Sequence, residues 1–362
     1  MREATPAFKG AIVFTGGGTG GHFFPAIALA EGARARWSDR QITFVGAQRG
    51  IEARELPDGP WPHLLLGVEG MVGRSPFRMT HSAWKLWRAV AQLKVMWRRE
   101  RPTVVVGTGG YAAAPALLAA RSLGIPFFLH ESNAAPGALA KWAAPRARRV
   151  WCGMEAVRPL LPGADCRVVG TPVRTAFLRT FRPVEDLVPP FRLLVLGGSG
   201  GARALNEALL EVAPRLLESL PEWEILHQVG PAESERLRDR PRHPRHAIVP
   251  FIARMDEALE TASLVISRAG ASTCAELKAV GRGAVLVPLR ASANDHQRMN
   301  ALAMASEGRA LVVEQAPGLT HHLESVVCPL MAEPLARQSL SMPPEANRAV
   351  ELCLDDLASY LA

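Results

Sequence analysis

The stretch Thr15-Gly16-Gly17-Gly18-Thr19-Gly20-Gly21-His22 follows a short apolar run at residues 11–14 and opens a segment with helical periodicity. A strand, a glycine-rich turn and a helix start in this order are typical of a phosphate-binding pocket. Main-chain N–H groups converge there, and glycine lets a ligand approach the backbone. The chain repeats the pattern at residues 191–202, where FRLLVL runs into GGSGGA. Two such turns predict two similar halves with a ligand held between them.

Length and composition favour a two-domain globular protein. The 362 residues suit two domains of about 180 residues each. No apolar stretch approaches the roughly 20 residues that cross a bilayer, and the N-terminus has no secretory apolar region, so we expect the chain to stay in the cytoplasm. The five cysteines form no C-x-x-C pair, which predicts reduced thiols rather than a disulfide scaffold.

Charge is distributed unevenly between the halves. Residues 1–180 hold 24 basic and 11 acidic residues, a net charge of +13, whereas residues 181–362 have a net charge of −5. A basic first half predicts an anionic partner. Nucleic acid, an anionic membrane and a pyrophosphate substrate all satisfy this criterion.

Short runs of β-branched and aromatic residues alternate with helical patterns in both halves, as expected of buried parallel strands. The predicted strands are residues 11–14, 42–45, 103–106, 127–129, 149–151, 192–196, 224–226, 247–249, 264–266 and 284–287. This alternation predicts an α/β chain of two Rossmann-like domains, each with a doubly wound parallel sheet.

Prolines place the domain boundary near residues 179–190. We expect an N-terminal domain at 1–180, a C-terminal domain at 181–344 and a terminal amphipathic helix at 345–362 that could lie on either domain.

The first glycine turn differs from two common nucleotide-binding motifs. It ends in Gly20-Gly21-His22 rather than Gly-Lys-Ser/Thr, which argues against a P-loop. The second strand ends in Gln48-Arg49 rather than an acidic residue, which weakens a dinucleotide-binding interpretation. Thr19 and His22 therefore become the candidate functional side chains of this turn, with tight strand-to-helix packing as the plainer alternative.

Three further segments carry polar side chains suited to a sugar nucleotide. Arg174 in GTPVR could reach a phosphate with its bidentate guanidinium, and a solvated surface arginine is the alternative. Glu276, one turn into the helix of SRAGASTCAE, is suited to accept two ribose hydroxyls. The amides of NDHQRMN, at residues 294–300, suit a sugar. There is no D-x-D motif and no His/Cys cluster with ligand spacing, so we expect no essential metal and no cofactor.

Eight motifs occur in order across residues 17–301: GGTGGHFFPA, GTGGY, HESNAAPG, VGTPVR, GGSGGARALN, HQVG, SRAGASTCAE and DHQRMNA. Together they resemble the MurG family of bacterial peptidoglycan glycosyltransferases. The resemblance implies a GT-B fold, with two Rossmann-like domains facing across a cleft. It also implies transfer of N-acetylglucosamine from UDP to the C4 hydroxyl of N-acetylmuramic acid in lipid I, undecaprenyl-pyrophosphoryl-MurNAc-pentapeptide, which forms lipid II.

The resemblance also assigns binding residues by matched position. They are Thr19, Gly20, Gly21, Asn133, Arg174, Ser199, Ile252, Ala271, Ser272, Thr273, Cys274, Ala275, Glu276, Gln297 and Asn300. Glu276 is expected on the ribose, Gln297 on the sugar hydroxyls and Ser199 near the phosphates, while the first turn also faces the acceptor pyrophosphate. Ser132 and Lys141 depart from the residues usual in the family.

The expected reaction is a single inverting displacement without metal. A base must take the proton of the acceptor hydroxyl, and His22 is the candidate, with Glu131 in reserve. An imidazole with a pKa near 6.5 suits this task. The alternative is a neutral His22 that hydrogen-bonds phosphate or backbone.

Residues 71–101 suggest how the chain meets its lipid substrate. A helix predicted over residues 82–99 has one apolar face, formed by Leu86, Val90, Leu93 and Trp97. Tryptophans flanked by basic residues are typical of an interfacial surface, and the alternative is a domain helix with a solvated basic face. The expected membrane contacts are Met71, Val72, Phe77, Trp84, Lys85, Trp87 and Arg88.

The expected partners are UDP-N-acetylglucosamine, lipid I and an anionic membrane at the cytoplasmic side of the cell membrane, with other cell-wall synthesis proteins as further candidates. Two competing functions stay open at this point. A UDP-sugar epimerase or another GT-B transferase would share the fold. A nucleic-acid binder would use the basic half, but no nucleic-acid motif appears, so we expect no nucleic acid.

Overall fold

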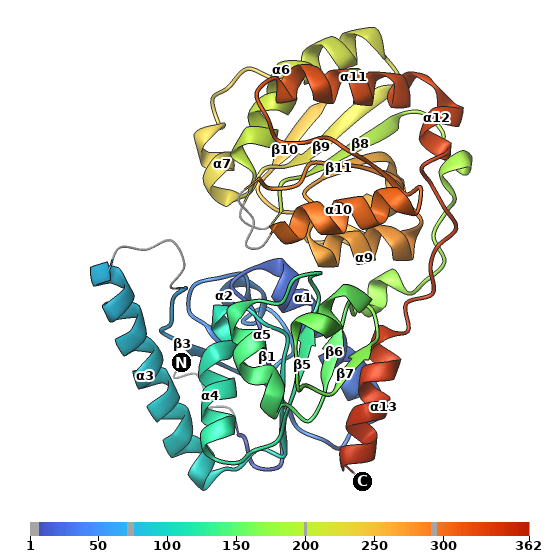
Figure 1. The fold of residues 1–362 in the computed structure, drawn as a ribbon. Coiled ribbons are helices and arrows are strands. Elements are labelled where there is room, and N and C mark those ends of the chain that lie inside the picture. The colour runs from blue at the N-terminus through green and yellow to red at the C-terminus, as the bar shows by residue number, and fades with distance from the viewer. Residues whose placement is uncertain (1–6, 71–75, 199–200, 291–294, 362) are drawn as a thin grey trace. The chain divides into compact units, whose positions relative to one another are not determined.

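A computed structural model describes residues 7–70, 76–198, 201–290 and 295–361, with only the backbone described at 76–78. The chain divides into two compact units (Figure 1). Unit 1 comprises Met1–Thr175 and Asn347–Ala362, and unit 2 comprises Ala176–Ala346. The chain thus leaves the first unit, forms the second and returns to the first.

Unit 1 is built on a parallel sheet. In chain order its strands are β1 (Ile12–Thr15), β2 (Ile42–Ala47), β3 (His63–Leu66), β4 (Val104–Gly107), β5 (Phe127–Glu131), β6 (Val150–Cys152) and β7 (Cys166–Val168). Their order in the sheet is β3-β2-β1-β4-β5-β6-β7. Strand β1 pairs on one side with β2, Ile12 opposite Ile42, and on the other with β4, Ile12 opposite Val104.

The helices of unit 1 connect and cover these strands. They are α1 (Gly20–Arg36), α2 (Glu52–Glu55), α3 (Pro76–Arg99), α4 (Ala114–Ser122), α5 (Ala138–Ala143) and α13 (Ala349–Leu361), with short 3-10 helices η1 (Tyr111–Ala113), η2 (Ala144–Arg146) and η3 (Glu155–Leu160). The terminal helix α13 packs against α1. A Cβ on Gly32 of α1 would lie 2.4 Å from Cγ1 of Val350, so the glycine permits this close approach.

Unit 2 repeats the architecture. Its strands are β8 (Phe191–Leu196), β9 (Trp223–Gln228), β10 (His246–Val249), β11 (Ala262–Ser267), β12 (Ala284–Leu286) and β13 (Ala310–Val312), in the parallel order β10-β9-β8-β11-β12-β13. Its helices are α6 (Arg203–Ser219), α7 (Pro231–Arg236), α8 (Met255–Thr261), α9 (Ala271–Val280), α10 (His296–Ser306), α11 (Leu319–Ala332) and α12 (Pro334–Gln338). The 3-10 helices η4 (Thr175–Phe177) and η5 (Val184–Asp186) precede the first of these strands.

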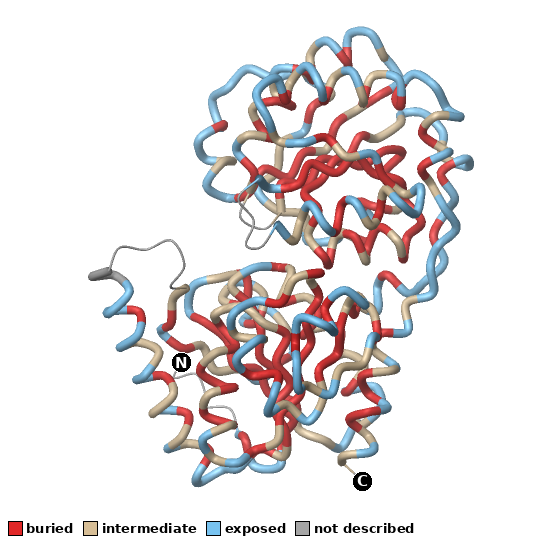
Figure 2. Tube along the Cα trace, viewed as in Figure 1, coloured by how far each residue is buried: buried red, intermediate tan, exposed pale blue. Residues whose placement is uncertain are grey.

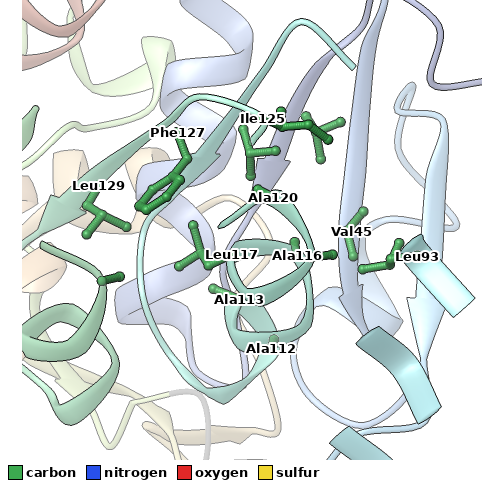
Figure 3. Close-up of a cluster of buried hydrophobic side chains, with 14 of the residues drawn as sticks. Val45, Leu93, Ala112, Ala113, Ala116, Leu117, Ala120, Ile125, Phe127 and Leu129 are labelled. Carbon is green, nitrogen blue, oxygen red and sulfur yellow. The ribbon is translucent and has the colours of Figure 1, made fainter. Parts of the chain in front are cut away.

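Each unit has its own hydrophobic core, and Figure 2 shows the buried residues gathered along the strands. In unit 1, small side chains of η1 and α4 such as Ala113 and Ala116 let the helix lie close to the sheet. Phe127 and Leu129 of β5 complete this cluster (Figure 3). Buried apolar strands covered by helices are the physical basis of the doubly wound sheet.

The predicted fold class is confirmed: both units are Rossmann-like α/β sheets. Each predicted strand is present, whereas β3, β7 and β13 were missed. All three missed strands lie at sheet edges, where one side of the strand has no neighbour.

In both sheets the strand order reverses beside the first strand, between β1 and β4 in unit 1 and between β8 and β11 in unit 2. Ligands of open parallel sheets bind at the carboxyl ends of the strands, at such a reversal. The two glycine turns follow β1 and β8, so each lies at this position in its own unit.

Candidate active site

The first glycine turn places two polar side chains at the start of α1. Thr19 has an extended backbone immediately before the helix, and its carbonyl accepts the N–H of His22 at 3.2 Å. Oγ1 of Thr19 and Nδ1 of His22 lie 3.1 Å apart. Thr19, Gly20, Gly21 and His22 therefore come together at a helix N-terminus, where partial positive charge favours an anion.

The turn that follows β4 packs against His22 and forms a hydrogen bond to its main chain. A Cβ on Gly109 would lie 2.6 Å from Cδ2 of His22, so the imidazole lies directly over this glycine. The φ of +98° at Gly109 also favours glycine. Oγ1 of Thr108 donates to the carbonyl of His22 at 2.6 Å. These residues belong to the GTGGY motif, in which no functional side chain was predicted.

Glu131 ends β5 and organises the loop that follows. Its Oε1 accepts the backbone N–H and the side-chain Nδ2 of Asn133, both at 3.0 Å, and its Oε2 accepts the N–H of Gly137 at 3.0 Å. The side chain is buried. A carboxylate that accepts three N–H groups of its own loop is suited to holding that loop, which favours His22 over Glu131 as the candidate base.

His130 and Ser132 form a second buried contact beside this loop. Nε2 of His130 lies 2.9 Å from the carbonyl of Gly170, and its Nδ1 lies 3.1 Å from Oγ of Ser132. Burial lowers the pKa of His130 to about 4, so the ring is neutral at pH 7. Since Nε2–H donates to the carbonyl, Nδ1 accepts from the Ser132 hydroxyl. Ser132, the departure from the family pattern, thus orients the histidine.

Arg174 lies beside the start of α1. Its guanidinium carbon is 4.2 Å from the ring centroid of Phe24. The same ring packs against Gly20, where an added Cβ would lie 3.0 Å from Cε2 of Phe24. The structure therefore brings Arg174 close to the first glycine turn, as the phosphate-binding interpretation requires.

In unit 2, Gln228 of the HQVG motif joins two loops at the carboxyl edge of the sheet. Its Oε1 accepts the N–H of Ile252 at 3.0 Å, and its Nε2 donates to the carbonyl of Gly198 at 3.3 Å. Ile252 is thus tied to the second glycine turn. Ser199 lies outside the described residues.

Helix α9 follows β11 and carries six of the expected binding residues. Ala271, Ser272, Cys274 and Glu276 are buried, whereas Thr273 and Ala275 are partly exposed. Burial raises the pKa of the Cys274 thiol to about 12, so this residue is not a thiolate at neutral pH.

Arg268, for which the sequence predicted no function, forms hydrogen bonds to the loop after β12. It is buried, and its Nη1 donates to the carbonyls of Val287 and Pro288 at 2.9 and 3.3 Å. Burial lowers the pKa of Arg268 to about 10, which leaves the side chain cationic at neutral pH. The next residue of this loop, Leu289, donates its N–H to Oε1 of Gln297 at 2.9 Å.

Asn300 is fully buried, and its Nδ2 donates to the carbonyl of Ala269 at 3.0 Å. It links α10 to the loop before α9. This position supports the loop from inside, and direct contact of Asn300 with substrate stays a prediction.

Comparison with known proteins identifies the family. Residues 12–152 match the glycosyltransferase family 28 N-terminal domain, and residues 192–352 match the family 28 C-terminal domain. A relative from Syntrophotalea carbinolica is 40% identical, covering 94% of this chain and 98% of the relative. One from Xanthomonas euvesicatoria pv. vesicatoria is 38% identical, covering 100% and 82%. Both are named UDP-N-acetylglucosamine--N-acetylmuramyl-(pentapeptide) pyrophosphoryl-undecaprenol N-acetylglucosamine transferase.

The chain belongs to the MurG family. The crystal structure of Acinetobacter baumannii MurG agrees, with a TM-score of 0.70 and 28% identity over 97% of this chain and 99% of that one. A Listeria monocytogenes structure named as a UDP-N-acetylglucosamine 2-epimerase has a TM-score of 0.67 at 15% identity, covering 98% of this chain and 97% of that chain. At that identity the likeness extends to the fold alone.

Helix α3 has a buried face and an exposed face. Leu93 and Trp97 are buried, as the predicted inward face requires, and α3 packs against α4. Trp84 and Trp87 are 50% and 68% exposed, and the Arg88 guanidinium lies 4.7 Å from the ring centroid of Trp84.

The other expected membrane contacts stay predictions. Nζ of Lys85 lies 2.6 Å from Oε1 of Glu69, so this side chain forms an ion pair within unit 1. Met71 and Val72 lie outside the described residues, as does the side chain of Phe77. Among the described helices, none is both long and apolar enough to span a bilayer.

Proposed function

We propose that this MurG family member transfers N-acetylglucosamine from UDP-N-acetylglucosamine to the C4 hydroxyl of N-acetylmuramic acid in lipid I, forming lipid II. The observation that carries the proposal is the near full-length similarity to relatives named for this reaction, at up to 40% identity. The positions of the glycine turns support it, since each follows the first strand of a Rossmann-like sheet, beside the reversal of strand order.

The chemistry follows from the residues at the first turn. The acceptor oxygen attacks C1 of the sugar, the bond from C1 to the diphosphate oxygen breaks, and UDP leaves with the electron pair. A single displacement inverts the anomeric configuration from α to β. His22 takes the hydroxyl proton, and Arg174 with the helix N-termini stabilises the charge of the leaving diphosphate without a metal.

Each half of the chain binds a different substrate. Residues 1–180 form the domain that meets the acceptor and the membrane, and residues 181–344 bind UDP-N-acetylglucosamine. Residues 345–362 form the helix that returns to the first half. The binding residues assigned to the first half are Thr19, Gly20, Gly21, Asn133 and Arg174. Those assigned to the second half are Ser199, Ile252, residues 271–276, Gln297 and Asn300.

The lipid substrate requires contact with a membrane, and helix α3 offers the surface. Exposed tryptophans beside arginine favour the interfacial region of an anionic bilayer. We assign Trp84, Trp87 and Arg88 to this contact, together with Met71, Val72 and Phe77. The site of action is the cytoplasmic face of the cell membrane, where other cell-wall synthesis proteins are further candidate partners.

The test is a transfer assay with radiolabelled UDP-N-acetylglucosamine and a short-chain lipid I analogue, run with excess chelator. We expect label in the lipid product, a β-linkage by proton NMR and no dependence on added divalent metal. Conversion of the UDP-sugar without a lipid acceptor would instead indicate an epimerase. Absence of label in the lipid would contradict the proposal.

A further inference from the structure

A buried carboxylate lies beneath the first glycine turn. Glu52 begins the short helix α2 and is 0% exposed. Its Oε2 accepts the N–H of Gly18 at 2.8 Å, and its Oε1 accepts the same N–H at 3.1 Å. Oε1 also accepts the N–H of Ala47, at the end of β2, at 3.2 Å. Glu52 thus joins two adjacent strand ends through their main chains.

Glycines from three segments make room for this carboxylate. A Cβ on Gly17 would lie 2.5 Å from Oε2 of Glu52, and one on Gly50 would lie 2.6 Å from the same atom. A Cβ on Gly46 would lie 2.9 Å from Cγ of Glu52. Any other residue at these positions would displace the side chain. The glycines of the turn therefore serve a buried glutamate as well as a ligand.

The position is electrostatically costly. Burial raises the pKa of Glu52, and only backbone N–H groups oppose that shift. Among the described residues, no basic side chain forms an ion pair with it. A negatively charged carboxylate does not attract a phosphate bound at the neighbouring turn. If Glu52 promotes phosphate binding, it must do so through the hydrogen bonds that it accepts from the turn.

We propose that Glu52 is a positioning residue for the acceptor pyrophosphate, an inference that rests on the proposed function. By holding the N–H of Gly18 inward, the carboxylate fixes the backbone one residue before Thr19. The N–H groups that begin α1 then keep the orientation in which they can bind phosphate. Such preorganisation raises affinity because the turn need not be ordered when the ligand binds.

Glu52→Gln is the sharpest variant, because the amide has the same shape. Since the Gly18 N–H contacts both carboxylate oxygens, either orientation of the amide places an –NH₂ donor against it. Glu52→Asp keeps the charge but shortens the reach, and it provides a second test if the glutamine variant fails to fold. Asp356→Asn is the control for loss of a buried carboxylate elsewhere in unit 1. Asp356, on α13, accepts Nε1–H of Trp151 at 2.9 Å and pairs with Arg149 and Arg167.

The first measurement is hydrogen exchange of the peptide covering residues 15–22 without substrate. We expect about tenfold faster exchange in Glu52→Gln, a smaller increase in Glu52→Asp and none in Asp356→Asn, because only the Glu52 variants remove or draw away the charged acceptor of the Gly18 N–H. Unchanged exchange in both Glu52 variants would overturn the positioning role.

The second measurement compares the KM for the lipid I analogue with the Kd for UDP. We expect the acceptor KM to rise about tenfold in Glu52→Gln while the Kd for UDP stays within twofold. Equal increases in the acceptor KM and the Kd for UDP would show that Glu52 has only a structural role, which would overturn the proposal. Faster exchange of residues 15–22 with an unchanged acceptor KM would overturn it as well. Failure of the wild-type protein to transfer sugar would overturn the proposed function, and hydrogen exchange would still decide whether Glu52 holds the turn.

Discussion

His22 lies at the N-terminus of α1, beside the Thr19 hydroxyl, and its ring packs against Gly109. For Nε2 to act as a base, Nδ1 must carry the proton and donate to Oγ1 of Thr19, 3.1 Å away. Thr19 therefore selects the tautomer as well as the orientation of the ring.

Replacement of His22 tests this role directly. We expect His22→Ala to lower kcat by about 10²–10⁴-fold, the usual contribution of a general base, with the Kd for UDP within about threefold of wild type. His63→Ala, in β3 of the same unit, is the control and should keep kcat. A loss in kcat below about tenfold would exclude His22 as the base and leave it as a neutral hydrogen-bonding group.

At this scale the sequence predicted only part of the site. Thr19 and His22 are adjacent to a recognisable motif, so their roles could be inferred locally. Glu52 is 34 residues from Gly18, so no local motif links the two residues. Gly46 and Gly50, shortly before the acid, were the available signal, and only the pairing of β1 with β2 brings these segments together.

Helix α3 has one face in the protein core and one face exposed to solvent. Its inward face packs into the core through Leu93 and Trp97, while Trp84 and Trp87 are exposed on the first half of the helix. The inward face agrees with the interpretation of α3 as a domain helix, and contact of the exposed tryptophans with a membrane stays a prediction. The inward face follows from helical spacing, but the pairing of Lys85 with Glu69 could not be predicted, because Glu69 precedes the helix.

A double variant tests the membrane contact. We expect Trp84→Ala with Trp87→Ala to weaken binding to anionic vesicles about tenfold, because both apolar anchors are lost. Higher salt should weaken wild-type binding further by screening the basic residues. Leu335→Ala removes another exposed apolar side chain, 80% exposed on α12, and should leave binding unchanged. Co-sedimentation that is equal for wild type and the double variant would contradict the assignment.

The three missed strands share a position in the sheets. Residues 63–66, 166–168 and 310–312 lie at sheet edges, and within them His63, Arg167 and Leu311 are not fully buried. Each strand has only three or four residues, too few for a clear periodic pattern. The remaining edge strand, β10, is equally short and was predicted at residues 247–249, so an edge position weakens the sequence signal without removing it.

In the molecule as a whole, three buried histidines link folding to pH. His227 and His246 stack in unit 2, with 3.3 Å between Nδ1 of the first and Nε2 of the second, and Nε2 of His227 lies 3.2 Å from Oδ1 of Asn206. Burial lowers the pKa values of His227, His246 and His130 to about 3, 4 and 4. Because each value is below the unfolded value near 6.5, the stability these neutral rings provide is complete above pH 6.5 and declines as the pH falls.

We therefore expect the free energy of unfolding to fall between pH 6.5 and pH 5, by roughly 2 kcal/mol for each of these histidines. The urea midpoint of unfolding should fall with it. His246→Gln removes one titrating ring and should flatten this pH dependence, although the variant is less stable at pH 7. His321→Gln, at an exposed position of α11, should leave the slope unchanged. A midpoint that is constant across this pH range would contradict the buried neutral state.

UDP binding, measured by titration calorimetry, tests whether the second sheet holds the uridine nucleotide through helix α9. We expect Glu276→Ala to weaken the Kd for UDP at least tenfold, because the proposed ribose contact provides two hydrogen bonds to the carboxylate, each worth about 1.5 kcal/mol. Glu218→Ala, at an exposed position of α6 in the same unit, should bind UDP like the wild type. Wild-type affinity for UDP in Glu276→Ala would exclude α9 as the ribose-binding helix.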